Sequence, residues 1–288
     1  MPQPTRNWLV STDWLAEHLN APDVKILDAS YNPMPGMPLD AHYNIEHIPG
    51  AQFFNIDEIA DTSNPLPHML PSPEKFVSRM RKMGIGDGDK VVVYDNAGMF
   101  SAPRAWWMFR VMGHDDVAVL DGGLPKWKAE GRPLESDPPP RPQPKHFTAR
   151  MQGELVRDLD DMRRISEQGG AQIVDARSPE RFHAIAPEPR PMPRAGHIPG
   201  SLNLPYAAIL NPDGTMRPPE QIRQLFEMAQ VDLNKPVVTT CGSGVTACIL
   251  ALGLATTGYE RAAVYDGSWT EWSQVPDTPV ATGEEPSS

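Results

Sequence analysis

The chain has 288 residues, about the length of two domains of common size. Hydrophobic residues make up 40% of it and charged residues 22%, which is the composition of a globular protein with packed cores. The net charge of −11 argues against a nucleic-acid-binding surface, and no apolar run is long enough to span a membrane.

Cysteine usage and the N-terminus narrow the class of protein further. Two cysteines, without a CxxC pair or a His/Cys cluster, argue against a disulfide framework and against a structural metal site. The first residues lack the long apolar segment of a secretory signal, so we expect a cytoplasmic protein.

Short β-branched runs alternate with helical patterns along the chain. The expected strands span 24–27, 90–95, 117–120, 171–176, 235–240 and 262–266. Helices are expected between Ser72 and Gly84, where Ser72 precedes Pro73, and at 158–168 and 219–229. Buried strands with interleaved helices predict an α/β fold, in which a parallel sheet is covered by helices on both faces.

A proline-rich segment near the middle separates two halves. Five prolines from Pro138 to Pro144 favour an extended backbone and exclude a regular helix. We therefore predict an N-terminal domain at 1–135, a linker at 136–150 and a C-terminal domain at 151–288.

The two halves repeat the same landmarks in the same order. Each contains the tetrapeptide HIPG, and each contains an Asp-Gly pair that is followed by tryptophan. Asn96 and Asp121 are 25 residues apart, and so are Cys241 and Asp266. Matching spacings of this kind indicate two copies of one domain.

Parallel α/β sheets bind ligands where strands end and helices begin. The equivalent positions here are Asn96 and Cys241, of which only the second is a nucleophile. We therefore expect the C-terminal domain to be catalytic and the N-terminal domain, with Asn96 at the loop position, to be a scaffold.

The loop that begins at Cys241 reads CGSGVTA and leads into an apolar helix. Its glycines permit a tight arc of inward-pointing backbone N–H groups, and the helix dipole behind the arc favours a thiolate. A cysteine phosphatase would need arginine where this chain has Ala247. The loop therefore favours attack on sulfur over attack on phosphorus.

The twin domains, their HIPG tetrapeptides, the DGG and DGS turns and the CGSGVTA loop resemble the rhodanese superfamily along nearly the whole chain. The loop is similar to that of the 3-mercaptopyruvate sulfurtransferases, because Gly242 and Ser243 stand where thiosulfate-using members typically carry a basic pair. The resemblance implies transfer of sulfur from 3-mercaptopyruvate through a Cys241 persulfide, with release of pyruvate. The acceptor would be a thiol, such as thioredoxin or a small dithiol, or cyanide, and no metal or organic cofactor would take part.

The resemblance also implies roles for individual residues. Cys241 would be the nucleophile, and Ser243 would form a relay with His68 and Asp57. Arg181 and Arg190 match arginines that bind the carboxylate and carbonyl of the substrate, a task that suits the guanidinium fork. The remaining residues expected to bind substrate lie in the loop, at Gly242, Gly244, Val245 and Thr246.

Other polar and aromatic residues are expected to be structural. We place Cys248 in the core, and Trp106 and Trp107 in the core or at a domain interface. Arg177 and Arg194 are expected in surface or domain-interface salt bridges, and the HIPG histidines His47 and His197 at turns.

Three further functions stay open. A thiosulfate:cyanide sulfurtransferase would use the same nucleophile with another donor. A non-catalytic twin-domain protein that binds a partner would be expected to lack the nucleophile that Cys241 supplies. A redox sensor would need the sulfur atoms of Cys241 and Cys248 to meet across the start of a helix, which requires backbone movement.

Overall fold

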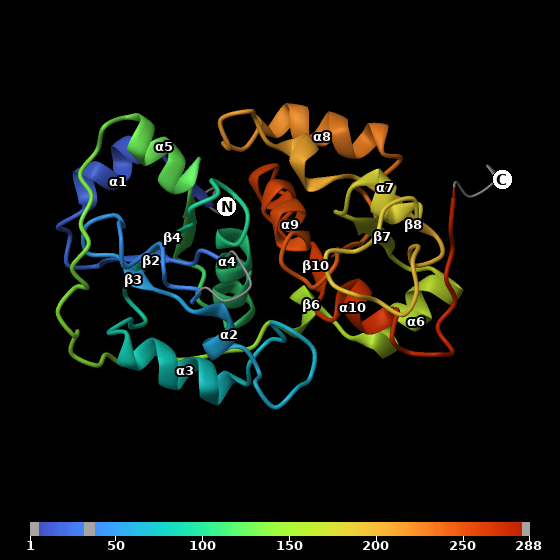
Figure 1. Cartoon of the computed structure of the whole chain (residues 1–288), viewed down its shortest axis with the longest axis horizontal. Helices are drawn as coiled ribbons and strands as arrows, with labels where there is room; N and C mark the ends of the chain where they lie inside the picture. The colour runs from blue at the N-terminus through green and yellow to red at the C-terminus, as the bar shows by residue number, and fades with distance from the viewer. Residues whose placement is uncertain (1–5, 32–37, 284–288) are drawn as a thin grey trace, which may run out of the picture. The chain divides into compact units, whose positions relative to one another are not determined.

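The computed structural model describes residues 6–31 and 38–283, which form two compact units (Figure 1). Unit 1 contains Met1–Ser63, Leu70–Gln152 and Leu210–Met216. Unit 2 contains Asn64–Met69, Gly153–Ile209 and Arg217–Ser288. Unit 2 therefore includes one short segment from the first half of the sequence, Asn64–Met69, and unit 1 includes one from the second half, Leu210–Met216.

The segment predicted as a linker is extended and belongs to unit 1. Lys145 in this segment pairs with Asp89 at 2.5 Å, and the Thr148 hydroxyl donates to Asp87 at 2.8 Å. The proline-rich stretch thus lies against the domain that precedes it. The predicted boundaries at 135 and 150 stay predictions.

Unit 1 is built on a five-stranded parallel sheet with the order β1-β5-β4-β2-β3. Its strands are β1 (Leu9–Val10), β2 (Val24–Asp28), β3 (Gln52–Phe53), β4 (Lys90–Tyr94) and β5 (Val117–Leu120). The three longest coincide with the runs predicted in the first half, because each is a β-branched segment buried on both faces.

The helices of unit 1 are α1 (Thr12–His18), α2 (Ile56–Ile59), α3 (Pro73–Lys82), α4 (Ala102–Val111) and α5 (Gly123–Ala129). Figure 1 shows α1 and α5 above the sheet and α3 below it. As predicted, α3 begins after Ser72, whose Oγ accepts the Lys75 N–H at 3.3 Å. The predicted core positions of Trp106 and Trp107 in α4 are confirmed, since both are at most 1% exposed.

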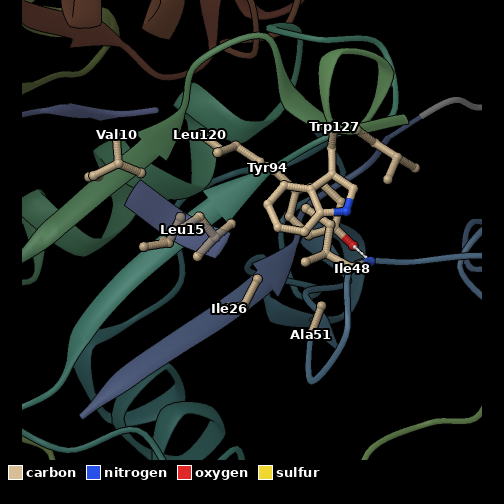
Figure 2. Close-up of a cluster of buried hydrophobic side chains, with 11 residues drawn as sticks. Val10, Leu15, Ile26, Ile48, Ala51, Tyr94, Leu120 and Trp127 are labelled. Carbon is tan, nitrogen blue, oxygen red and sulfur yellow. Dashed lines mark hydrogen bonds between the residues drawn. The ribbon is translucent and has the colours of Figure 1, made fainter. Parts of the chain in front are cut away.

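A hydrophobic cluster joins α1 and α5 to the sheet of unit 1 (Figure 2). The indole N–H of Trp127 donates to the Pro133 carbonyl at 2.8 Å, and the Tyr94 hydroxyl accepts the Ile48 N–H at 3.2 Å. Large aromatic side chains can be buried here because these bonds satisfy their polar atoms. The rest of the cluster is aliphatic: Val10, Leu15, Ile26, Ala51, Val92, Ala118, Leu120 and Leu124.

Unit 2 repeats the same sheet, with the order β6-β10-β9-β7-β8 and parallel pairing. Its strands are β6 (Val156–Arg157), β7 (Gln172–Asp175), β8 (Ser201–Asn203), β9 (Val237–Thr240) and β10 (Ala263–Tyr265). The duplication inferred from the sequence is therefore present in the topology, strand for strand.

The helices of unit 2 are α6 (Leu159–Gln168), α7 (Pro179–Phe182), α8 (Pro219–Met228), α9 (Ala247–Thr256) and α10 (Ser268–Trp272), with short 3-10 helices at Gly153–Leu155 and Tyr206–Ile209. Figure 1 shows α8 on one side of the sheet and α6 and α10 on the other. The indole N–H of Trp272 donates to the Pro279 carbonyl at 2.8 Å, as Trp127 does to Pro133 in unit 1. Within the two described ranges, no helix has the length and apolar character needed to cross a membrane.

The HIPG histidines have the structural role that we predicted. His47 exchanges two backbone hydrogen bonds with Glu135, and His197 does the same with Ala281. Both imidazoles are buried, and the Nδ1 atom of each lies within 2.9 Å of a main-chain carbonyl. Each therefore joins the turn before β3 or β8 to a segment of the same unit that lies more than 80 positions later in the sequence.

Ser72→Ala should lower the free energy of unfolding by about 1 kcal/mol, because the first turn of α3 loses an acceptor for the Lys75 N–H. Urea denaturation followed by tryptophan fluorescence measures the change. Ser78→Ala, at an exposed position of the same helix, is the matched control and should change stability by less than about 0.5 kcal/mol. Equal losses in the two variants would contradict the capping role.

Candidate active site

Cys241 follows β9, the central strand of the unit 2 sheet. All four residues of β9 are buried, and Cys241 itself is 2% exposed. The helix α9 begins at Ala247, so a short loop joins strand and helix. The predicted order of strand, cysteine loop and helix is present.

Hydrogen bonds to the start of α10 hold the backbone of Cys241. The Cys241 N–H donates to Ser268 Oγ at 3.2 Å, and the Cys241 carbonyl accepts the Trp269 N–H at 3.0 Å. The Gly242 carbonyl accepts both the N–H and the hydroxyl of Thr270, at 2.9 and 2.7 Å. Both peptide groups of Cys241 are therefore fixed from outside the loop.

Ser268 supplies one of these bonds from a strained backbone. Its φ of 50° lies in the left-handed region, which residues with a side chain rarely adopt. In unit 1 the same turn position is Gly123, with a φ of 53°. A glycine would adopt this conformation more easily, but only the serine provides a hydroxyl for the Cys241 N–H.

The rest of the loop presents backbone donors. Ser243, Val245 and Thr246 donate their N–H groups to no acceptor within the part of the chain that the structure describes. Ser243 and Thr246 are half-buried, so solvent reaches the loop. Loop N–H groups ahead of a helix N-terminus favour an anion.

Backbone pairing identifies the residue of unit 1 that corresponds to Cys241. The Tyr94 carbonyl, at the end of β4, accepts the N–H of the residue that follows β2, at 2.8 Å. The Thr240 carbonyl, at the end of β9, accepts the N–H of the residue that follows β7, also at 2.8 Å. The next residues, Asp95 and Cys241, are therefore equivalent. The prediction of Asn96 at this position is wrong by one residue, because the span to Asp121 is one residue longer in unit 1.

The loop of unit 1 encloses a carboxylate of its own. Asp95 is fully buried, and its carboxylate accepts four backbone N–H groups at 2.7–2.9 Å, from Ala97, Phe100, Ser101 and Ala102. Burial raises the pKa of Asp95, although these N–H groups act in the opposite direction. This loop shows that the architecture at this end of the sheet can bind a negative charge.

Arg181 lies directly against the nucleophile loop. Its Nε donates to Glu188 Oε2 at 3.1 Å, and its Nη2 contacts the same oxygen. A Cβ atom at Gly242 would be 2.9 Å from Arg181 Nη2, so a side chain at this position would displace the guanidinium from its present place. The structure thus brings together two predicted substrate-binding residues, Gly242 and Arg181.

Arg177 forms the predicted salt bridges, but they lie in the interior of unit 2 and not at the surface or at a domain interface. Its Nε and Nη2 donate to the Asp175 carboxylate at 2.6–3.1 Å, and its Nη1 donates to Glu188 at 2.7 Å. Burial opposes the charge, but the carboxylates of Asp175 and Glu188 raise the pKa of Arg177 above its ordinary value. The physical reason is that Asp175, at the buried end of β7, requires a cation.

Arg190 is joined to His68. Arg190 Nη2 and His68 Nε2 are 3.3 Å apart, although 122 positions separate the residues in sequence. Because a guanidinium only donates, His68 Nε2 is the acceptor and we assign the ring proton to Nδ1. His68 is 4% exposed and belongs to the segment Asn64–Met69 of unit 2.

The relay of Ser243, His68 and Asp57 stays a prediction. Asp57 lies in α2 of unit 1, where its N–H donates to Asn55 Oδ1 at 3.1 Å, whereas Ser243 and His68 belong to unit 2. One contact of His68 joins its Nε2 to Arg190 Nη2.

Arg194 and Cys248 have structural surroundings. The Arg194 guanidinium donates to main-chain carbonyls at the end of α10 and beyond it, including that of Trp272 at 2.7 Å. The predicted salt bridge of Arg194 is therefore wrong, because carbonyls at a helix end replace the carboxylate. Cys248 is fully buried with its thiol 3.2 Å from the Gly244 carbonyl, which confirms its place in the core.

Sequence reasoning missed three residues around the loop, namely Ser268, Thr270 and Glu188. A signal existed for Ser268, because DGS in one half aligns with DGG in the other and glycine marks a left-handed position. Glu188 is a lone acid among arginines and prolines, and no pattern reveals that it bridges two of them. Thr270 gives no signal in the sequence.

The site combines a buried thiol, loop N–H donors and an arginine beside the loop. This set suits nucleophilic attack with development of negative charge in the substrate. Among the residues that the structure describes, no group of three or more His, Cys, Asp or Glu side chains could hold a metal ion.

Comparison with known proteins identifies the family of the chain. The chain matches the rhodanese-like domain model over residues 11–130 and 158–275. The chain belongs to the rhodanese family. The 3-mercaptopyruvate sulfurtransferase of Homo sapiens is 44% identical to it, over 92% of this chain and 91% of the human protein. Thiosulfate/3-mercaptopyruvate sulfurtransferase 1 of Arabidopsis thaliana, described as mitochondrial, is 43% identical over 96% and 78%.

A solved structure extends the similarity to the fold. SseA of Escherichia coli, described as a 3-mercaptopyruvate sulfotransferase with the rhodanese fold, has a TM-score of 0.83 to this rhodanese chain. It is 38% identical, over 92% of this chain and 99% of SseA. The predicted family and the predicted pair of α/β domains are confirmed.

Ser268→Ala should lower the free energy of unfolding by about 1–2 kcal/mol, because the buried Cys241 N–H loses its acceptor. Ser268→Gly removes the same hydroxyl but relieves the left-handed backbone, so it should be about 1 kcal/mol more stable than the alanine variant. Chemical denaturation of the three proteins measures both differences. An alanine variant as stable as the glycine variant would exclude strain at this position.

Proposed function

We propose that this protein transfers the sulfur of 3-mercaptopyruvate to a thiol or to cyanide through a persulfide on Cys241, with release of pyruvate. The observation that carries the proposal is the loop after β9, where a thiol precedes unengaged N–H groups and Arg181 lies against Gly242. The names of the relatives support the predicted enzyme class, a 3-mercaptopyruvate sulfurtransferase.

In the first half-reaction, the Cys241 thiolate attacks the sulfur of the donor. An S–S bond forms, the C–S bond breaks, and its electron pair passes to the carbon skeleton as the enolate of pyruvate. Arg181 and Arg190 would bind the carboxylate and carbonyl, and their charge would stabilise the enolate. Ser243, with His68, would deliver the proton that converts the enolate into pyruvate.

In the second half-reaction, an acceptor thiolate or cyanide attacks the outer sulfur of the persulfide. The S–S bond breaks with its electron pair on Cys241, which regenerates the thiolate. The N–H groups of Ser243, Val245 and Thr246 would stabilise negative charge on the outer sulfur between the two steps. Thioredoxin, or a small dithiol, is the acceptor that we propose, and a cytoplasmic location stays a prediction.

Thiosulfate is the second candidate donor. The Arabidopsis relative is named for both donors, so family membership alone does not select one. Gly242 and Ser243 favour 3-mercaptopyruvate, because the loop lacks the basic pair that would suit a dianion.

Intact mass spectrometry after incubation with each donor tests the donor and the intermediate together. Wild-type protein should gain one sulfur atom, chiefly with 3-mercaptopyruvate, and Cys241→Ser should gain none and lose all sulfur transfer to cyanide. Cys248→Ser is the matched control and should still gain one sulfur atom. A gain chiefly with thiosulfate would favour the second donor, and turnover by Cys241→Ser would exclude the persulfide.

Arg190→Gln should reduce kcat/KM for 3-mercaptopyruvate roughly 30-fold, because loss of a charge-assisted contact to the carboxylate removes about 2 kcal/mol of binding. Steady-state kinetics with cyanide as acceptor measures the effect, which should raise KM through lost binding of the carboxylate and lower kcat through lost stabilisation of the enolate. Arg164→Gln removes the same charge from an exposed position of α6 and should leave both constants unchanged. An unaltered KM in Arg190→Gln would contradict the binding role.

A further inference from the structure

We propose that Glu188 is a positioning residue that holds Arg181 beside the loop and makes the site select monoanionic over dianionic sulfur donors. The inference rests on the proposed function and adds a determinant of donor choice.

Glu188 bridges two arginines. Its Oε1 accepts from Arg177 Nη1 at 2.7 Å, and its Oε2 accepts from Arg181 Nε at 3.1 Å. The Glu188 side chain is only 6% exposed, so its charge is little screened by solvent. A buried carboxylate held at both oxygens has a fixed position, and it fixes the groups that bind it.

The bridge is anchored on its inner side. Arg177 is fully buried, also donates to Asp175 and to the Gly196 carbonyl (2.9 Å), and lies 4.8 Å from the centre of the Trp269 ring. Arg181, on the outer side, is 24% exposed. Ion pairs thus connect Asp175 to Arg177, Arg177 to Glu188 and Glu188 to Arg181, from the buried sheet to the solvent-accessible face. Glu188 is the residue that orients Arg181.

The outer end of this series of ion pairs meets the nucleophile loop at one point. A Cβ atom at Gly242 would be 2.9 Å from Arg181 Nη2 and 3.8 Å from Glu188 Oε2. The carboxylate of Glu188 therefore lies close to the residue that follows Cys241. Any anion bound there interacts with Glu188 as well as with Arg181.

Charge balance gives the selectivity. The carboxylates of Asp175 and Glu188 offset the positive charges of Arg177 and Arg181. Arg181 therefore offers directed N–H donors with little surplus positive charge. A donor with one carboxylate can bind those N–H groups. A dianion such as thiosulfate brings a second negative charge toward Glu188, which disfavours it.

Kinetics with both donors test the inference, with cyanide as acceptor. Glu188→Gln keeps the shape and removes the charge, so it should raise the ratio of kcat/KM for thiosulfate to that for 3-mercaptopyruvate about tenfold. The thiosulfate KM should fall, and the 3-mercaptopyruvate KM should rise as Arg181 loses its anchor. Glu188→Asp keeps the charge and should leave the ratio near that of the wild type.

Glu180→Gln is the matched control, because it removes a fully exposed carboxylate from the neighbouring helix α7 and should not change the ratio. An unchanged ratio in folded Glu188→Gln, or equal loss with both donors, would overturn the inference. Failure of the proposed function would look different, since wild-type protein would then take no sulfur from 3-mercaptopyruvate.

A measurement on the wild type covers the case in which Glu188→Gln does not fold. Inhibition of 3-mercaptopyruvate turnover by methanesulfonate, a monoanion, should exceed inhibition by sulfate, a dianion of similar shape, at equal concentration and ionic strength. Sulfate that inhibits as well as methanesulfonate would overturn the inference.

Discussion

Parallel pairing of β7, β9 and β10 is the constraint on which the site depends. It places the carboxyl ends of three neighbouring strands at one edge of the sheet, and the residues after them build the site. Arg177 follows β7, Cys241 follows β9 and Ser268 follows β10. Because the strands are buried and their register is fixed, short loops are enough to hold these groups together.

The loops after β4 and β9 occupy equivalent places in the two units but carry different side chains. In unit 1, four loop N–H groups donate to the buried carboxylate of Asp95, so these four donors are not available to an external anion. In unit 2 a thiol replaces that carboxylate, and loop donors stay unengaged. With Cys241 in place of the aspartate, the loop of unit 2 lacks these stabilising hydrogen bonds, but its N–H groups can bind an anionic substrate. Functional sites commonly reduce stability in this way.

The sequence was sufficient for features that depend on local patterns or on repetition. The β-branched runs predicted the long strands, Ser72 and Pro73 predicted the start of α3, and repeated spacings predicted the duplication. The placement of Cys241 between a buried strand and a helix was also predictable, because a cysteine followed by a glycine-rich loop is a local signal.

Other features depended on contacts between distant residues, and sequence reasoning failed there. The salt bridge of Arg177 was expected at the surface or at a domain interface because arginine is rarely buried, but the buried Asp175 overrides this tendency. Asn96 was chosen by residue counting, which fails when one loop is longer by a residue. Glu188 and Thr270 act through partners that only the folded chain identifies.

Unit 2 is built from segments that are not contiguous in the sequence, which has a consequence for the gene that encodes it. Asn64–Met69 belongs to this unit, and His68 within it contacts Arg190, yet both flanking segments belong to unit 1. The polar groups around Arg190 are therefore not encoded by one contiguous stretch. A fragment that begins after the proline-rich segment would retain the cysteine and lack the histidine, so the duplicated halves of this protein are no longer independent modules.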